Sequence, residues 1–164
     1  MKLRLERPDD VSAIRALTYA AFAATSFSDG TEGAIPDKLR RDGDLVLSLL
    51  AEASGVVIGQ VSVSPATVGG AEGWYGIGPI AVAPDRFRQG IGSALIHAAI
   101  GWALGRGAAG LVLTGSDEYY PRFGFEAGEV SYLTTPRRYC HRLVLHGPAA
   151  RGEITFARAL QEAG

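Results

Sequence analysis

The sequence predicts an α/β fold, because the middle of the chain combines a hairpin with a strand–helix–strand unit. Residues 45–53 and 56–64 are largely apolar and are separated by a short turn, which predicts two antiparallel strands. Residues 74–82, 90–105 and 110–114 are predicted as strand, helix and strand. A unit of this kind joins parallel strands by a right-handed crossover. These five segments are the predicted centre of the fold.

The elements before the hairpin follow from local signals. Residues 3–5 alternate between apolar and polar side chains and predict a short strand. Residues 7–10 contain proline and aspartate where helix starts favour them, and an apolar stripe continues to about Ala23, which predicts a helix. Residues 24–44 are polar and mixed, with one further helix predicted at 35–41.

The elements after the central unit are shorter. Residues 119–125 predict a short helix that ends at a glycine, and residues 126–139 predict a loop. Residues 143–145 and 153–157 predict a closing hairpin. The sequence contains no repeat, low-complexity segment or linker, so residues 1–164 are expected to form one domain.

The strand at 74–82 has an irregularity at its centre. A glycine-rich loop at 68–73 precedes it, and Pro79 interrupts it. Proline cannot donate to a central ladder, so Pro79 marks either a bulge or a place where neighbouring strands separate. Separation would leave main-chain groups of residues 80–82 free for an extended ligand.

The composition is that of an ordinary globular protein, with 47% hydrophobic residues and a net charge of −1. This charge predicts no binding to nucleic acid or to an anionic membrane surface. No apolar run is long enough to span a membrane, and residues 1–6 do not resemble a signal peptide. The single cysteine allows no internal disulfide. Together these features predict a cytoplasmic protein.

That cysteine, Cys140, has two interpretations. It could be a nucleophile, or it could be a half-buried structural thiol, which is the commoner role. His141 points to the opposite face of the strand, which argues against a Cys–His pair.

The segment 83–95 predicts an anion site, because it joins an apolar strand to a helix through a glycine-bearing turn. The first N–H groups of a helix have no partner within it, and its dipole is positive at that end. Gly90 and Gly92 would let a phosphate approach the main chain. On the two glycines alone, a tight turn without a ligand is the alternative. No Gly-Lys-Ser/Thr follows, and Leu95 stands where a dinucleotide site has its third glycine, which favours the phosphate of another cofactor.

Three segments together resemble the GNAT superfamily of N-acetyltransferases, and in particular its YhbS-like branch. They are GWYGIGPIAV at 73–82, RQGIGSAL at 88–95 and YYPRFGF at 119–125, and the similarity covers nearly the whole chain in order. The resemblance implies a mixed, twisted central sheet, split between two parallel strands, with helices on both faces. It also implies transfer of an acetyl group from acetyl-CoA to a primary amine of a small molecule or peptide. Dimers are frequent among such enzymes, so a homodimer is one expected assembly.

The resemblance also implies which residues bind acetyl-CoA. The pantetheine arm would pair with the main chain of Ile80, Ala81 and Val82. The pyrophosphate would bind main-chain N–H groups of the segment made up of Arg88, Gln89, Gly90, Ile91, Gly92 and Ser93. The family motif has Gln or Arg where this chain has Phe87, with Arg86 and Arg88 on either side. This departure leaves open which side chain orders the loop. No metal site is expected.

The implied general acid is Tyr120, which matches the family's tyrosine ahead of the Gly-Phe pair. A phenol, with a pKa of about 10, can protonate a leaving thiolate of comparable basicity. Tyr119 is the second choice, and packing without catalysis is the alternative for Tyr120. A backbone N–H near Val82 would stabilise the developing oxyanion.

The sequence identifies no general base. The available carboxylates are Glu32, Glu72, Asp117 and Glu118, and each is expected to be a solvated surface group. Water could relay the proton instead. Two other functions stay open at this stage: a non-catalytic CoA-binding or sensing module, and an unrelated protein that binds ATP or NAD.

Overall fold

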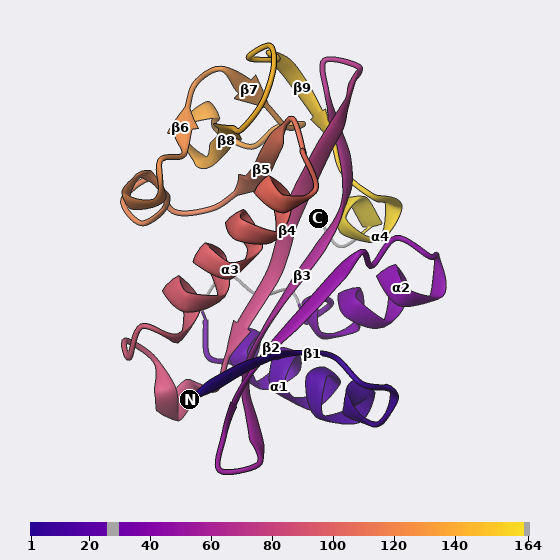
Figure 1. Ribbon diagram of the computed structural model, residues 1–164, viewed down its shortest axis with the longest axis vertical. Helices are drawn as coiled ribbons and strands as arrows, with labels where there is room; N and C mark the ends of the chain where they lie inside the picture. Colours follow the sequence, from indigo (N-terminus) through magenta and orange to yellow (C-terminus); the bar gives the residue numbers. More distant parts are fainter. Residues whose placement is uncertain (26–29, 163–164) are drawn as a thin grey trace.

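The computed structural model describes residues 1–25 and 30–162, and a strongly twisted sheet runs along its long axis (Figure 1). The sheet order is β1-β2-β3-β4-β5-β8-β6, with β9 added to the end of β3 and β7 paired to β9. The strands are β1 (Lys2–Leu5), β2 (Leu47–Ala53), β3 (Val56–Val68), β4 (Ala71–Val82), β5 (Gly110–Thr114), β6 (Glu126–Ala127), β7 (Val130–Ser131), β8 (Cys140–Val144) and β9 (Gly152–Thr155).

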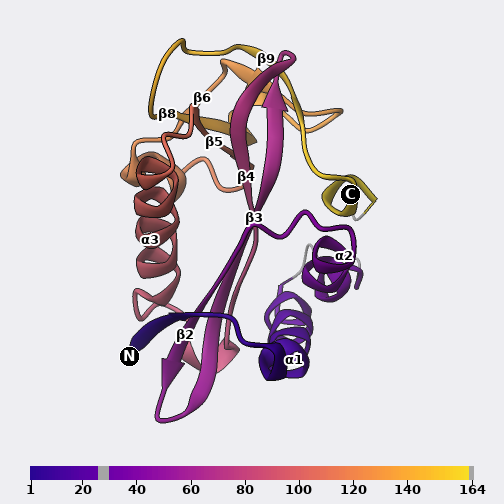
Figure 2. The ribbon, with the colours of Figure 1, turned by 45° about the vertical axis from the view of Figure 1, so that its right-hand side comes forward.

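Helices cover both faces of the sheet, as predicted. They are α1 (Val11–Ala23), α2 (Ile35–Arg41), α3 (Ile91–Gly105) and α4 (Arg158–Glu162). Figure 2 shows α3 on one side of the strands, with α1, α2 and α4 on the other. Between them, residues 58–64 of β3 are buried without interruption. None of the described helices has the length and apolar character needed to cross a membrane.

The central sheet is split beyond residue 76, where the sequence predicted an irregularity. The parallel pairing of β4 with β5 covers only three residue pairs, from Trp74 with Gly110 to Gly76 with Val112. On its other edge, β4 shifts register against β3 around Pro79. Both predicted meanings of Pro79 therefore hold, since the strand bulges and its neighbour separates.

The predicted closing hairpin is wrong. β8 pairs with β5 and β6, whereas β9 pairs with β7 and with the end of β3. The reason lies in the turn at Gly69 and Gly70, whose φ angles of 54° and 84° allow a tight connection. The predicted glycine-rich loop is therefore a hairpin, and β3 continues to Val68. This extension gives β9 an edge with which to pair.

The segment 119–125 folds as predicted, into one short helical turn at Tyr120–Phe123 that ends at Gly124 with a φ of +96°. The segment 126–139, predicted as a loop, also contains the two short strands β6 and β7.

Candidate active site

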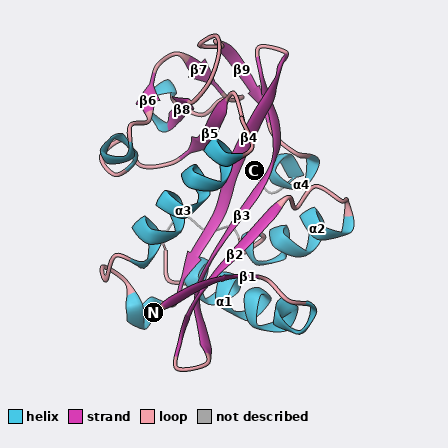
Figure 3. Cartoon of the chain, in the orientation of Figure 1, coloured by secondary structure: helices cyan, strands magenta, loops and turns pink. Residues whose placement is uncertain are grey.

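The connection from β4 to α3 forms the wall of a cavity of about 620 Å³. Figure 3 shows this connection running from the end of β4 to the start of the helix. Gly90 precedes the helix with a φ of +81°, a left-handed conformation that favours glycine. The first N–H groups of α3 are therefore available at the cavity. Its described lining residues are Val82, Arg86, Phe87, Arg88, Gly90, Ile91, Gly92, Ser93, Tyr119 and Arg122.

The cavity contains most of the predicted pyrophosphate segment and the preceding residues Val82, Arg86 and Phe87, together with two residues from the turn after β5. Gln89 is exposed and is not among its described lining residues. Tyr119 and Arg122 were not predicted to belong there. The hydroxyl groups of Tyr119 and Ser93 lie 3.0 Å apart, at hydrogen-bond distance. The Arg122 guanidinium lies 4.6 Å from the centre of the Tyr119 ring, and its Nε donates to the Tyr119 carbonyl at 2.9 Å.

Phe87 occupies the position where the family motif has Gln or Arg, so another side chain has to order the pyrophosphate loop. The contacts of Tyr119 with Ser93 and Arg122 lie at this loop. Gly92 faces the same tyrosine, since a Cβ there would lie 3.4 Å from the Tyr119 hydroxyl. The turn after β5 therefore packs directly on the start of α3. No local signal in the sequence could have identified this, because Tyr119 lies 26 residues from Ser93.

A series of cavities follows β4 away from the glycine loop. A small one of about 200 Å³ shares Val82 and Phe87 with the first. It also shares Phe22 and Ile80 with a third cavity of about 460 Å³. Ala81 takes no part through its side chain, which is fully buried against α1. The series runs beside residues 80–82, the segment beyond the pairing with β5.

The third cavity lies at the split itself. Its described lining residues are Phe22, Glu32, Ile35, Ile77, Gly78, Pro79, Ile80, Thr114, Tyr120, Tyr132, Leu133, Thr134, Thr135, Phe156 and Leu160. Tyr120 and Tyr119 thus line different cavities, although they are neighbours in the chain. Of the four carboxylates considered from the sequence, only Glu32 is among these residues. Asp117 instead faces Arg138 at 3.8 Å.

Tyr120 occupies a largely apolar surrounding. Its ring centre lies 5.6 Å from that of His141 and 6.0 Å from that of Phe125. Gly115 leaves room for the ring, since a Cβ there would lie 2.6 Å from Tyr120 Cε2. His141 Nε2 lies 3.0 Å from the Gly115 carbonyl, which can only accept, so this nitrogen is the donor. Burial raises the pKa of Tyr120 to about 12, with a smaller contribution from Tyr119. The phenol therefore keeps its proton throughout the neutral range.

Cys140 is buried more deeply than predicted. Its side chain is fully inaccessible and packs in the cluster of Trp74, Val112 and Ile154. Burial raises the pKa of its thiol, the opposite of what a nucleophile needs. His141 packs against Tyr120, away from this cluster. These observations favour the structural interpretation.

Comparisons with known proteins agree with this geometry. The model of the acetyltransferase (GNAT) family matches residues 12–125. The N-acetyltransferase YhbS of Escherichia coli (strain K12) is 36% identical over 128 residues, which are 77% of this chain and 74% of YhbS. The crystal structure of a GNAT family acetyltransferase from Brucella melitensis in complex with acetyl-CoA matches with a TM-score of 0.86 and 41% identity, over 97% of each chain. The structure of E. coli YhbS in complex with CoA matches with a TM-score of 0.88 and 27% identity, over 99% of this chain and 93% of that one.

Proposed function

The chain belongs to the GNAT family of acetyltransferases, and we propose that it uses the series of cavities beside β4 to transfer an acetyl group from acetyl-CoA to an amine. The observation that carries this proposal is the continuity of the series. It begins at the glycine loop, which suits a pyrophosphate, and ends beside Tyr120 at the split in the sheet.

Acetyl-CoA binds with its pyrophosphate on the main chain of residues 88–93. The positive end of α3 and the guanidinium groups of Arg86, Arg88 and Arg122 at the same cavity support this placement. The pantetheine arm follows residues 80–82 in the manner of an added strand, since their pairing with β5 has ended. The thioester then reaches the cavity that contains Tyr120.

Catalysis needs a neutral amine, a stabilised oxyanion and a protonated leaving group. The amine nitrogen attacks the thioester carbon, and a main-chain N–H of residues 80–82 stabilises the oxygen. The carbon–sulfur bond breaks, and the Tyr120 hydroxyl gives its proton to the thiolate. The nitrogen of the new amide loses one proton, which water relays to the Tyr120 oxygen, so the phenol is restored. The raised pKa of Tyr120 makes it a weaker acid than a free phenol. Desolvation in the same cavity also raises the basicity of the thiolate, so the two remain matched.

The proposal is tested by calorimetric titration with acetyl-CoA, CoA, NAD and ATP, followed by an assay of CoA release with a panel of amines. Binding of the two CoA compounds, with CoA release that depends on an amine, is expected. Binding without turnover by any amine would instead indicate a sensing module. Binding of NAD or ATP, without binding of either CoA compound, would contradict the proposal that this chain uses the family's co-substrate.

We also propose a cytoplasmic location, which the free, buried thiol of Cys140 supports. A catalytic domain comprising residues 1–164 and a homodimeric assembly stay predictions. Light scattering of the purified protein tests the assembly.

A further inference from the structure

We propose that His141 is a positioning residue for the proton donor: its Nε2–H holds the Gly115 carbonyl, and Gly115 in turn fixes the ring of Tyr120 at the split in the sheet. Tyr120 is taken as the proton donor here, so the role of His141 rests on the proposed function. His141 is a buried titratable side chain that no step of the proposed mechanism uses.

His141 lies in the interior of the sheet. It belongs to β8, where it pairs with Leu113 on β5 and with Ala127 on β6. Its side chain is fully inaccessible to solvent. An aliphatic side chain would fill such a place without burying any polar atom, so the presence of histidine here calls for a reason other than packing.

The two ring nitrogens of His141 have different surroundings. Nε2 donates to the Gly115 carbonyl oxygen at 3.0 Å. Nδ1 is buried and has no hydrogen-bond partner among the described residues. A buried nitrogen without a partner lowers stability. Histidine therefore leaves one nitrogen unpaired in order to make one hydrogen bond, and that bond is the reason for its presence.

This hydrogen bond holds the residue against which the Tyr120 ring packs. Gly115 follows the end of β5, and its N–H donates to the Tyr139 carbonyl at 2.9 Å. Both main-chain groups of Gly115 are therefore bound to residues 139–141. A Cβ at Gly115 would lie 2.6 Å from Tyr120 Cε2, so the ring is in direct contact with this residue. The His141 ring contacts Tyr120 as well, with ring centres 5.6 Å apart.

The backbone of the turn that carries Tyr120 is held by other groups. Ser116 Oγ accepts from the main-chain N–H of Tyr119 at 3.1 Å, and the Tyr119 hydroxyl lies 3.0 Å from that of Ser93. Loss of the hydrogen bond from His141 should therefore release the Tyr120 ring and leave the turn and the pyrophosphate cavity in place. A proton donor has to lie within hydrogen-bond distance of the leaving sulfur, so a displaced ring lowers kcat.

Two amide side chains separate this hydrogen bond from the rest of the ring. Glutamine carries its NH₂ group about as far from the main chain as Nε2 of histidine, whereas the NH₂ of asparagine reaches only as far as Nδ1. His141→Gln should keep the bond to Gly115 and a kcat within about threefold of wild type, whereas His141→Asn should lower kcat roughly 10–100-fold. KM for acetyl-CoA should change in neither variant, because His141 is not among the described lining residues of the three cavities.

Both constants are measured as CoA release, with the amine of the panel that is acetylated fastest and at a temperature well below the Tm of each variant. A wild-type kcat in His141→Asn would overturn the proposal. An equal loss of kcat in His141→Gln and His141→Asn would also overturn it, because the hydrogen bond to Gly115 would then have no role of its own.

A double-variant cycle separates positioning from a general structural effect. In a Tyr120→Phe background no hydroxyl remains to be positioned, so adding His141→Asn should lower kcat by no more than about twofold further. A further loss as large as in the wild-type background would overturn the proposal. Gly115→Ala displaces the Tyr120 ring while His141 stays intact, and it should lower kcat in the same way even if the His141 variants do not fold. A wild-type kcat in Gly115→Ala would contradict the role of this contact.

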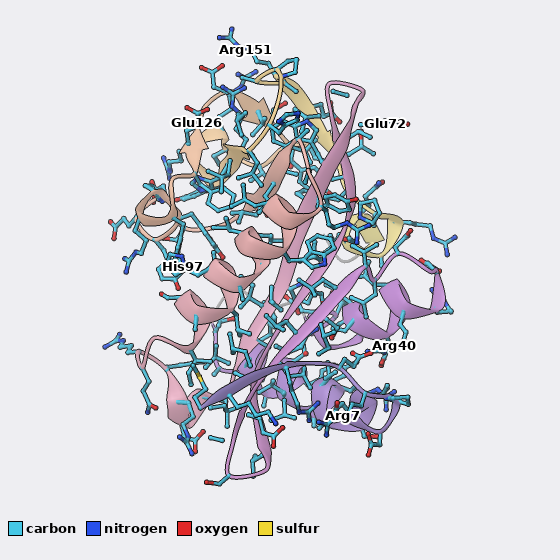
Figure 4. All side chains as sticks on the ribbon, viewed as in Figure 1. Arg7, Arg40, Glu72, His97, Glu126 and Arg151 are labelled. Atoms are coloured by element: carbon cyan, nitrogen blue, oxygen red, sulfur yellow. The ribbon has the colours of Figure 1, made fainter. Side chains whose placement is uncertain are left out.

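His97→Asn is the matched control. His97 is exposed on α3 (Figure 4) and packs against Phe123 of the same turn, with ring centres 5.1 Å apart. It is not among the described lining residues of the three cavities. His97→Asn should therefore leave kcat and KM unchanged, and a loss of kcat equal to that in His141→Asn would overturn the special role of His141.

Failure of this inference is distinguishable from failure of the proposed function. If Tyr120→Phe loses kcat and His141→Asn does not, only the role of His141 is wrong. If Tyr120→Phe keeps full kcat, the proposed proton donor and the role of His141 are both wrong. If acetyl-CoA neither binds nor is consumed with any amine, the proposed function itself is wrong.

Discussion

Removing the hydroxyl of Tyr120 tests the central step of the proposed mechanism. Tyr120→Phe keeps the ring, and with it the contacts to His141 and Phe125 at 5.6 and 6.0 Å between ring centres. No hydrogen bond joins the Tyr120 hydroxyl to another described residue, so the stability should change by no more than about 0.5 kcal/mol. Loss of a general acid should lower kcat by roughly 10²–10⁴-fold, or about 2.7–5.4 kcal/mol in the barrier.

The pH dependence of kcat/KM gives a second, independent test of the role of Tyr120. An acid that must be protonated produces a falling limb at its pKa, and burial raises the pKa of Tyr120 to about 12. In the wild type, kcat/KM should therefore rise with pH as the amine loses its proton, near a pKa of about 10 for an alkylamine. No falling limb should occur below about pH 10. A falling limb between pH 7 and 9 would contradict the assignment of this acid.

Tyr119→Phe is the matched control. It removes the hydrogen bond to Ser93 at 3.0 Å, in the cavity assigned to the pyrophosphate. The loss of about 1 kcal/mol should raise KM for acetyl-CoA roughly fivefold and leave kcat nearly unchanged. CoA release measured with a thiol reagent provides both constants. If Tyr120→Phe kept full kcat, the proposed acid would be wrong, and a loss of kcat in Tyr119→Phe instead would transfer the role to its neighbour.

Three further predictions concern binding and stability. Gly92→Val should weaken acetyl-CoA binding at least tenfold in calorimetry, because its side chain would meet the Tyr119 hydroxyl, whereas Gly101→Val, in open space on the same helix, should not. Arg122→Gln should weaken acetyl-CoA binding and reduce the dependence of the binding affinity on salt. An unchanged affinity would mean that the guanidinium only holds the turn. Hydrogen bonds from Arg4 hold the pKa of Asp10 at about 2, so the stability that they contribute is present above pH 4 and lost as the pH falls through 2. Asp10→Asn should therefore reduce the free energy of unfolding at pH 7 by roughly 1–3 kcal/mol, which is measured as a lower Tm. Near pH 2 the Tm difference between the variant and the wild type should be smaller. Equal Tm values at pH 7 would contradict this.

The cofactor side of the site was largely predictable because its signals are contiguous in the chain. A strand that ends, two glycines and an apolar helix occupy one segment, and local geometry alone directs the N–H groups of α3 outward. The irregularity at Pro79 was predictable for a similar reason, since a missing N–H affects the ladder at that position whatever the rest of the fold does.

The acceptor side was not predictable from local signals. Phe22, Glu32, Tyr132 and Phe156 lie in four separate segments, and long-range packing brings them to one cavity. The sequence placed Glu32 among solvated carboxylates because nothing near it indicates that Gly33 packs on α1. The wrong closing hairpin has the same origin, since it assumed that the last two strands pair with each other.

The adjacent tyrosines explain how one short turn can serve both ends of the bound cofactor. Successive residues in a tight helical turn point about 120° apart. Tyr119 thus reaches Ser93 at the start of α3, while Tyr120 lines the cavity at the split. Gly124 ends the turn with a φ of +96°, which keeps this pair in place without lengthening the helix. Correct seating of the pyrophosphate loop and correct placement of the proton donor therefore depend on the same few residues. A change that disturbs the backbone of the turn should alter cofactor affinity and kcat together, whereas Gly92→Val and Tyr119→Phe, which leave that backbone in place, should alter affinity alone.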